Sequence, residues 1–193
     1  MNIKLIIVFI FILFSRNAIS QSVSDLELVA AAMELTKQEV TYDPSYFSLT
    51  YPMGDVPANK GVCTDVIIRA YRKVGIDLQQ LVHEDMVANF SVYPKNWGLT
   101  STDKNIDHRR VPNLMTYFSR HGKTLPKTEQ ASDYKPGDIV CWNLGDGLTH
   151  IGIVVDKKSD DGTPMIVHNI GGGQVIENCL FRFTIIGHYQ YLP

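Results

Sequence analysis

The alternation of apolar and polar residues is clearest between Thr149 and Asn169, which reads THIGIVVDKKSDDGTPMIVHN. Two short β-branched runs flank a polar connection that contains Asp-Gly, a pattern typical of an antiparallel hairpin. If the connection folds symmetrically about Ser159, His150 lies opposite His168. Directly opposed side chains have Cβ atoms about 4.5–5.5 Å apart on one face of a sheet. The pattern therefore predicts two neighbouring imidazoles, unless a β-bulge changes the register.

The hairpin runs THIGIVV and PMIVHNI and three further segments in the C-terminal part have the length and the β-branched content of strands. The three are PGDIVCW, QVIENCL and TIIGHYQY. The first half of the chain instead has apolar residues at helical spacing. Helices followed by a run of strands favour an α+β fold with an antiparallel sheet.

The helical half has recognisable starts and stops. Ser24 opens an S-x-x-E capping box ahead of a first helix that should end near Val40. A second, amphipathic helix begins at Cys63, with Gly75 where a C-terminal cap belongs. Helical spacing resumes at Leu78, and the run NIDHRRVPNL introduces a later helix with proline in its first turn.

The composition adds little to this picture. A chain of 193 residues fits one domain, and 45% hydrophobic with 20% charged residues is ordinary for a globular protein. A net charge of -2 gives no general argument for binding nucleic acid or an anionic membrane surface.

Residues 1–20 have the features of a secretory signal peptide. Lys4 precedes the apolar run 5–14, and the small residues of an A-x-S cleavage site follow. The apolar run is too short to span a bilayer comfortably. We therefore expect an exported protein, periplasmic or secreted, without stable membrane insertion, whose residues 21–193 form a single domain.

An exported chain with three cysteines has at least one unpaired thiol. Cys141 and Cys179 lie in two of the expected strands, where they either pair or serve as small buried hydrophobic residues. Cys63 lies in the first turn of a helix, where the partial positive charge lowers a thiol pKa. It is either an inert core cysteine or a nucleophile. Together, His150 and His168 favour the nucleophile, because they would supply a base and an orienting group.

A basic cluster, His108, Arg109 and Arg110, precedes the later helix. Cations are mildly unfavourable at a helix start, so this placement favours an anion site. The alternative is local pairing with Asp103 and Asp107, which contributes little at a surface.

The order of these motifs resembles the NlpC-type cysteine peptidases. That superfamily has a papain-like fold and mostly cleaves peptide or amide bonds in bacterial cell walls. More closely, the segments GVCTDVIIRAYR, GIDLQQLVHEDM, NIDHRRVPNL, PGDIVCW and IVHNIGGG resemble a bacterial family of unknown function related to that superfamily. The resemblance runs from about Tyr42 to Tyr191.

The resemblance implies Cys63 as nucleophile, His150 as general base and His168 as the residue that orients the base. It also implies a place near the oxyanion site for Tyr51. The substrate-binding candidates are then Tyr51, Asp65, Asp107, His108, Arg109 and Arg110. Two departures limit the transfer of substrate choice: Cys-Thr-Asp replaces Cys-Ser-Gly at the nucleophile, and about 78–125 is a large helical insertion.

The expected activity is hydrolysis of a peptide or amide bond in peptidoglycan stem peptides, with no cofactor. In this hypothesis Arg109 or Arg110 binds a substrate carboxylate through two parallel hydrogen bonds. One alternative is a non-catalytic module that binds cell-wall peptides or a partner protein. Another is a zinc hydrolase, with Cys63, His150 and His168 as ligands and an open position for water.

Overall fold

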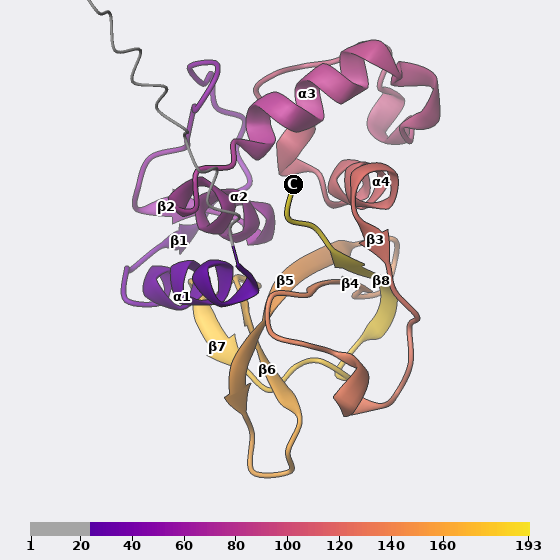
Figure 1. Cartoon of the computed structure of the whole chain (residues 1–193). Helices are drawn as coiled ribbons and strands as arrows, with labels where there is room; N and C mark the ends of the chain where they lie inside the picture. The colour runs from indigo at the N-terminus through magenta and orange to yellow at the C-terminus, as the bar shows by residue number, and fades with distance from the viewer. Residues whose placement is uncertain (1–23) are drawn as a thin grey trace, which may run out of the picture.

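The computed structural model describes residues 24–193. Four α-helices gather on one side of a six-stranded sheet (Figure 1). They are α1 (Asp25–Leu35), α2 (Cys63–Lys73), α3 (Leu78–Ala88) and α4 (Val111–His121). The predicted signal peptide lies outside the described residues. Among the residues that are described, no helix is long and apolar enough to cross a membrane.

The six-stranded sheet is antiparallel throughout, in the order β3-β8-β4-β5-β6-β7. Its strands are β3 (Lys123–Thr124), β4 (Ile139–Asn143), β5 (Thr149–Lys158), β6 (Pro164–His168), β7 (Val175–Glu177) and β8 (Thr184–Gln190). A separate parallel pair consists of β1 (Thr41–Tyr42) and β2 (Lys60–Gly61). Helices first and an antiparallel sheet second confirm the predicted α+β class.

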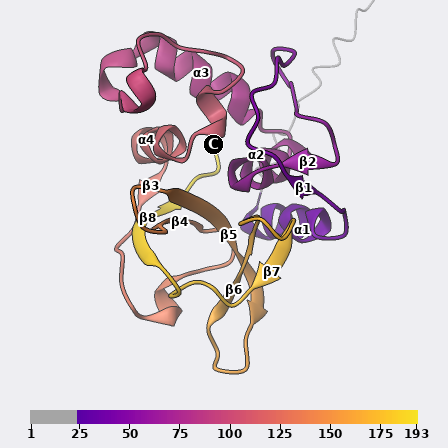
Figure 2. The ribbon, with the colours of Figure 1, turned by 180° about the vertical axis from the view of Figure 1, so that it is seen from behind.

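Short 3-10 turns connect the helices that follow α2. They are η1 (Phe90–Val92), η2 (Asn96–Gly98) and η3 (Asp107–Arg109), with η4 (Ala131–Asp133) before the sheet. Seen from both sides, α1 and α2 cover the β5 side of the sheet and α4 covers the β3–β8 side, with α3 beyond it (Figures 1 and 2). The stretch predicted as an insertion therefore extends the helical layer over the other half of the sheet.

The helix starts agree with the sequence patterns. Ser24 and Glu27 form both hydrogen bonds of the capping box at the start of α1. The prediction that this helix reaches Val40 is wrong, because it ends at Leu35 and the Thr36 hydroxyl donates to a carbonyl of the last turn. The second helix begins at Cys63, as predicted.

The sheet is buried on both faces, and strand alternation assigns each residue of β5 to one of them. Ile151 and Ile153 belong to the main core, with the helices and Cys63. Val154 belongs to a second apolar cluster on the other face, with Trp142 of β4. Because His150 pairs with Trp142 across β4 and β5, it lies on this second face.

The hairpin register differs from the symmetric prediction. Ile153 pairs with Val167, and an irregularity follows Val154. Continued toward the start of β5, this register places His168 opposite Gly152 rather than opposite His150. The observed pairing differs from the symmetric one by two residues, so both histidines remain on the same face of the sheet. A difference of one residue would have placed them on opposite faces.

Candidate active site

The two histidines form a hydrogen-bonded pair inside the molecule. His150 Nε2 lies 2.8 Å from His168 Nδ1, with the ring planes at 76°. Both side chains are buried, and Trp142 packs against the ring of His150 with centroids 5.7 Å apart. Gly152 makes the diagonal approach possible, because a Cβ there would lie 3.2 Å from His168 Cβ and 2.5 Å from a methyl group of Ile166. The sequence prediction of neighbouring imidazoles is confirmed.

Burial keeps both imidazoles neutral. It lowers the pKa of His150 to about 3, and the neighbouring His168 adds to the effect. Burial also lowers the pKa of His168, against an opposing contribution from the Glu177 carboxylate. A neutral imidazole has one nitrogen with a free lone pair that can accept a hydrogen bond, but the lowered pKa disfavours the protonated form at neutral pH.

The pairing leaves Nδ1 of His150 available. Within residues 24–193 this nitrogen forms no hydrogen bond. It is also not among the side-chain atoms that are buried without a hydrogen-bond partner, so it is not fully shielded from solvent. If Nε2 carries the ring proton and donates it to His168, Nδ1 holds the lone pair. His168 can then orient a base.

Cys63 is the first residue of α2 and is buried, with 5% of its surface exposed. The backbone amides of Ile151, Thr64 and Cys63 itself act on the thiol and lower its pKa, but burial is the larger effect and raises that pKa to about 12. The expectation of a lowered thiol pKa at this helix start is therefore wrong. Desolvation outweighs the amides, and the thiol is protonated at neutral pH.

Cys63 contacts the backbone next to His150 but, within residues 24–193, forms no hydrogen bond with the histidine pair. The amide that approaches the thiol belongs to Ile151, the residue directly after His150. In the part of the chain that the structure describes, no hydrogen bond connects Cys63 Sγ to His150 or His168. The thiol lies against the backbone of β5 on the helical side, while His150 belongs to the opposite face of that strand.

Asp65 and Arg109 form a buried ion pair. The guanidinium donates through Nε and Nη2 to both carboxylate oxygens, at 2.9 and 3.0 Å. Asp65 also accepts from the amide of Val62, which caps α2 directly before Cys63. The guanidinium is fully engaged, since its Nη1 donates to the Ser45 carbonyl. Arg109 is therefore not free to bind a substrate carboxylate, and Asp65 holds the helix start.

The other members of the basic cluster also have internal roles. His108 is buried, and burial followed by the Arg109 charge lowers its pKa to about 3, so it is not a cation at neutral pH. Asp107 bonds to His83 Nδ1 at 2.8 Å and is fully buried. Arg110 stacks its guanidinium over Trp97, 4.4 Å from the ring centroid. The predicted anion site of three cations is therefore wrong. Arg110 is the one member of the cluster that remains a candidate.

Tyr51 contacts two residues of α3. Its hydroxyl donates to Glu84 at 3.4 Å, and its ring packs edge-on against His83. Tyr42 lies closer to the nucleophile candidate: β1 pairs it with Gly61, two residues before Cys63. Partial burial raises the pKa of Tyr42, and Cys63 lies near enough to raise it further when the thiol is ionised. The sequence analysis missed Tyr42, because strands of two residues leave no periodic signal.

All three cysteines are free. Cys141 packs in the main core with Cys63, whereas Cys179 belongs to the second cluster on the other sheet face. The two do not pair, which decides between the open alternatives. Cys179 is more than a small hydrophobic residue, because its Sγ lies 3.6 Å from His168 Nε2.

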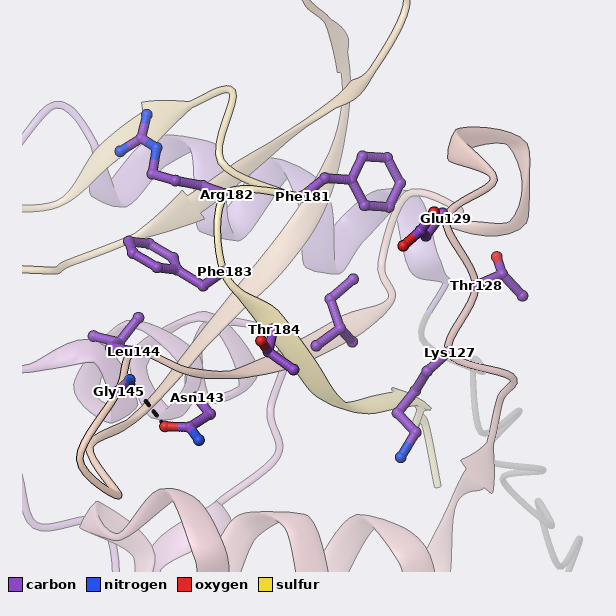
Figure 3. A pocket seen from close by; sticks show the side chains of 11 residues that line it. Lys127, Thr128, Glu129, Asn143, Leu144, Gly145, Phe181, Arg182, Phe183 and Thr184 are labelled. Carbon is purple, nitrogen blue, oxygen red and sulfur yellow. Dashed lines mark hydrogen bonds between the residues drawn. The ribbon is translucent and has the colours of Figure 1, made fainter.

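A broad cavity of about 940 Å³ opens where β4 ends and β8 begins (Figure 3). Lys127 and Arg182 lie at its two ends, and Phe181 projects between the segments that contribute them (Figure 3). Cys63, His150 and His168 do not line it. The cavity is therefore separate from the histidine pair.

Comparison with known proteins assigns the chain to a family. The model of the family described as "Domain of unknown function (DUF1287)" matches residues 29–191. The chain belongs to this family. This confirms the predicted membership of a family of unknown function. "Uncharacterized protein YijF" of Escherichia coli (strain K12) is 53% identical over 171 residues, which cover 89% of this chain and 83% of that protein.

Two solved structures from Trichomonas vaginalis are similar to this member of DUF1287. They are NlpC1, at 16% identity and a TM-score of 0.44, and NlpC2, at 15% identity and a TM-score of 0.45. The matches cover 84% and 90% of this chain. The chain spans 43% and 49% of the lengths of those two proteins.

Proposed function

We propose that this DUF1287 protein is an exported thiol hydrolase that cleaves a peptide or amide bond, with Cys63 as nucleophile, His150 as base and His168 as orienting residue. One observation carries the proposal. Two neutral imidazoles share a 2.8 Å hydrogen bond that leaves Nδ1 of His150 free, and the next residue, Ile151, approaches Cys63 with its backbone amide at the start of α2. In enzymes with an activated nucleophile, the base is commonly a histidine whose second nitrogen is held in place by another polar group.

The first step transfers the thiol proton of Cys63 to Nδ1 of His150. Since burial keeps this thiol protonated, the reaction needs the base at the moment of attack. The transfer requires a rearrangement at the start of β5 that brings Sγ and Nδ1 together, because they share no hydrogen bond within residues 24–193 and belong to opposite faces of this strand. The thiolate then attacks the carbonyl carbon, and the imidazolium returns its proton to the departing amine.

The second step returns the enzyme to its starting state. Water attacks the thioester carbon as His150 accepts its proton, and the acid product leaves as Cys63 regains a proton. The amides of Cys63 and Thr64 are directed at the sulfur, at the end of α2 where amides have no partner within the helix. Amides so placed can stabilise the oxyanion of both steps. The phenol of Tyr42, beside Gly61, is a further candidate donor.

For the substrate we propose stem peptides of peptidoglycan. Support comes from the sequence resemblance and from the signal-like segment at residues 1–20, both of which suit an extracytoplasmic wall polymer. Free carboxylates of such peptides suit Arg110, whose Nη1 has no hydrogen-bond partner among residues 24–193. Arg109 is not proposed for this role, because Asp65 occupies it.

A binding module without turnover is the second candidate, and one observation favours it. Cys63 is buried and protonated, and it makes no hydrogen bond to the histidines within residues 24–193. The zinc hydrolase with Cys63, His150 and His168 as ligands has no such support. The potential ligand atoms of these three residues do not gather within 4.8 Å of one another.

Product analysis on purified wall fragments distinguishes the enzyme from the binder. The protein should release new amino and carboxyl termini from the fragments, and Cys63→Ala should abolish the release. Cys141→Ala is the matched control, since it removes a buried thiol from the same core without touching the nucleophile. Binding of fragments without release by either protein would favour the module.

A further inference from the structure

The side of His168 that faces away from His150 is surrounded by potential metal ligands. Its Nε2 lies 3.3 Å from Glu177 Oε2 and 3.6 Å from Cys179 Sγ. One potential ligand atom from each of these three residues lies within 4.8 Å of the other two. The proposed hydrolysis uses neither Glu177 nor Cys179 as a reacting group, so it does not explain why these two residues gather at His168.

The distances in the cluster match the edges of a zinc tetrahedron. With Zn–N near 2.05 Å, Zn–O near 2.1 Å and Zn–S near 2.3 Å, two such ligands lie about 3.3–3.4 Å apart for N and O, and about 3.5–3.6 Å apart for N and S. The observed separations are 3.3 Å and 3.6 Å. Two of the three edges of the ligand set therefore match a zinc site, and the third, between Glu177 and Cys179, is at most 4.8 Å.

The surroundings of the cluster also suit a metal. Metal-binding histidines almost always donate through their second nitrogen to a fixed partner, and His168 Nδ1 already contacts His150 at 2.8 Å. The Glu177 side chain is 35% exposed, which provides a route from solvent and room for water as the fourth ligand. Arg182 opposes binding, because its guanidinium pairs with Glu177 at 2.9 Å.

We propose that His168 Nε2, Glu177 and Cys179 Sγ form a binding site for a divalent metal ion of the zinc type. Nitrogen, sulfur and carboxylate oxygen together are a donor set that Zn²⁺ accepts in tetrahedral sites. On binding, Cys179 releases its thiol proton to solvent, and His168 presents the lone pair of Nε2. The ring proton of His168 must then lie on Nδ1.

This tautomer has a consequence that rests on the proposed function. With its proton on Nδ1, His168 donates to His150 Nε2, and the ring proton of His150 must lie on its own Nδ1. That nitrogen can no longer accept a proton from Cys63. Without metal, Glu177 instead holds the proton of His168 on Nε2, which leaves the base active. Metal bound at this site therefore switches hydrolysis off.

Calorimetry with zinc chloride on the metal-free protein tests the site itself. We expect one zinc per chain. Cys179→Ala and Glu177→Gln should each weaken binding by more than about 100-fold, because even outer partners of metal ligands contribute 10–100-fold. Arg182→Gln should tighten it. A thiolate-to-metal charge-transfer band with Co²⁺ should appear in the wild type and vanish in Cys179→Ala.

Two matched controls keep this test decisive. Cys141→Ala removes a buried thiol on the opposite sheet face and should bind zinc like the wild type. Cys63→Ala should also bind normally. Glu177 is only half-buried, so Glu177→Gln can report on binding even if Cys179→Ala fails to fold. Absence of stoichiometric binding by the wild type, or loss of binding in Cys63→Ala, would overturn the site.

Hydrolysis assays test the switch separately from the proposed function. One equivalent of zinc should suppress the wild-type rate at least 10-fold, while Glu177→Gln should retain most of its own zinc-free rate. Full activity of the zinc-loaded wild type would overturn the switch. If wall fragments are not cleaved under any condition, the proposed function fails, and calorimetry still decides whether the metal site exists.

Discussion

At Cys63, two physical effects act on the same thiol in opposite directions. Backbone amides at the start of α2 favour the thiolate, and burial favours the thiol. Burial is the larger effect and raises the pKa to about 12. The sequence could reveal the helix start, but not the depth at which the tertiary fold would bury it. A thiol with a raised pKa needs a base to remove its proton, and in the proposed function that base is His150.

The histidine pair should behave as one unit with unequal members. His150→Ala removes the base and should lower kcat/KM by about 10²–10⁴-fold. His168→Asn should keep more activity than His168→Ala, because an amide oxygen can still accept the proton of His150 Nε2. The His150→Ala/His168→Ala double variant should be scarcely worse than His150→Ala, since no base remains to be oriented.

The measurement is kcat/KM for these four variants and the wild type on one wall-peptide substrate. Thermal melts must first show that each variant folds, because both side chains are buried. Independent, multiplicative losses would show that the two histidines do not act in one site.

At the scale of elements, local patterns predicted which segments form helices and strands, but not how they are aligned. The capping box at Ser24 and the helix start at Cys63 are encoded within a few residues. The register of the β5–β6 hairpin depends on an irregularity after Val154, which has no local signal. The partner of Arg109 is equally non-local, because Asp65 precedes it by 44 residues. Long-range pairs of this kind need the tertiary fold.

The buried Asp65–Arg109 ion pair, which connects α2 to η3, should contribute strongly to the free energy of unfolding. Asp65→Asn leaves the buried guanidinium without its charge partner, which costs about 3–5 kcal/mol when a buried pair loses one member. Urea unfolding of the variant and the wild type measures the difference. Glu34→Gln is the matched control, because it breaks an exposed pair with Lys73 and should cost at most about 1 kcal/mol. An equal loss of unfolding free energy in the two variants would show that the buried pair contributes no more than an exposed one.

At the scale of the whole molecule, the sheet separates two sets of chemistry. Cys63 lies with the helices, and the histidines lie with Trp142 and Cys179 on the other face. The sequence predicted which strands carry the histidines, but not which face of β5 the helix α2 would cover. The α+β order of elements was predictable from periodicity, whereas the packing of α2 against Ile151 was not.

The buried histidines should make the folded state sensitive to acid. The pKa of His108 is about 3 in the folded chain, against about 6.5 for an unfolded histidine. Between these values the unfolded chain binds more protons, so stability falls as the pH drops from about 6.5 to about 3. Each unit of pH then costs about 1.4 kcal/mol per histidine. His150 behaves in the same way.

Urea unfolding between pH 7 and pH 4 measures this dependence. His108→Leu should reduce its slope by about one proton, since leucine does not titrate and His108 Nδ1 has no hydrogen-bond partner to lose. A slope unchanged by this substitution would show that His108 is not neutral in the folded state.

The most direct test of the central claim is to identify the residue that carries the acyl group during turnover. The protein is mixed with a wall peptide, the reaction is quenched in acid within the first turnover, and the adduct is located by mass spectrometry of its peptides. We expect a thioester on Cys63 that is absent from Cys63→Ala. An adduct on Cys141 or Cys179, or undiminished hydrolysis by Cys63→Ala, would contradict it.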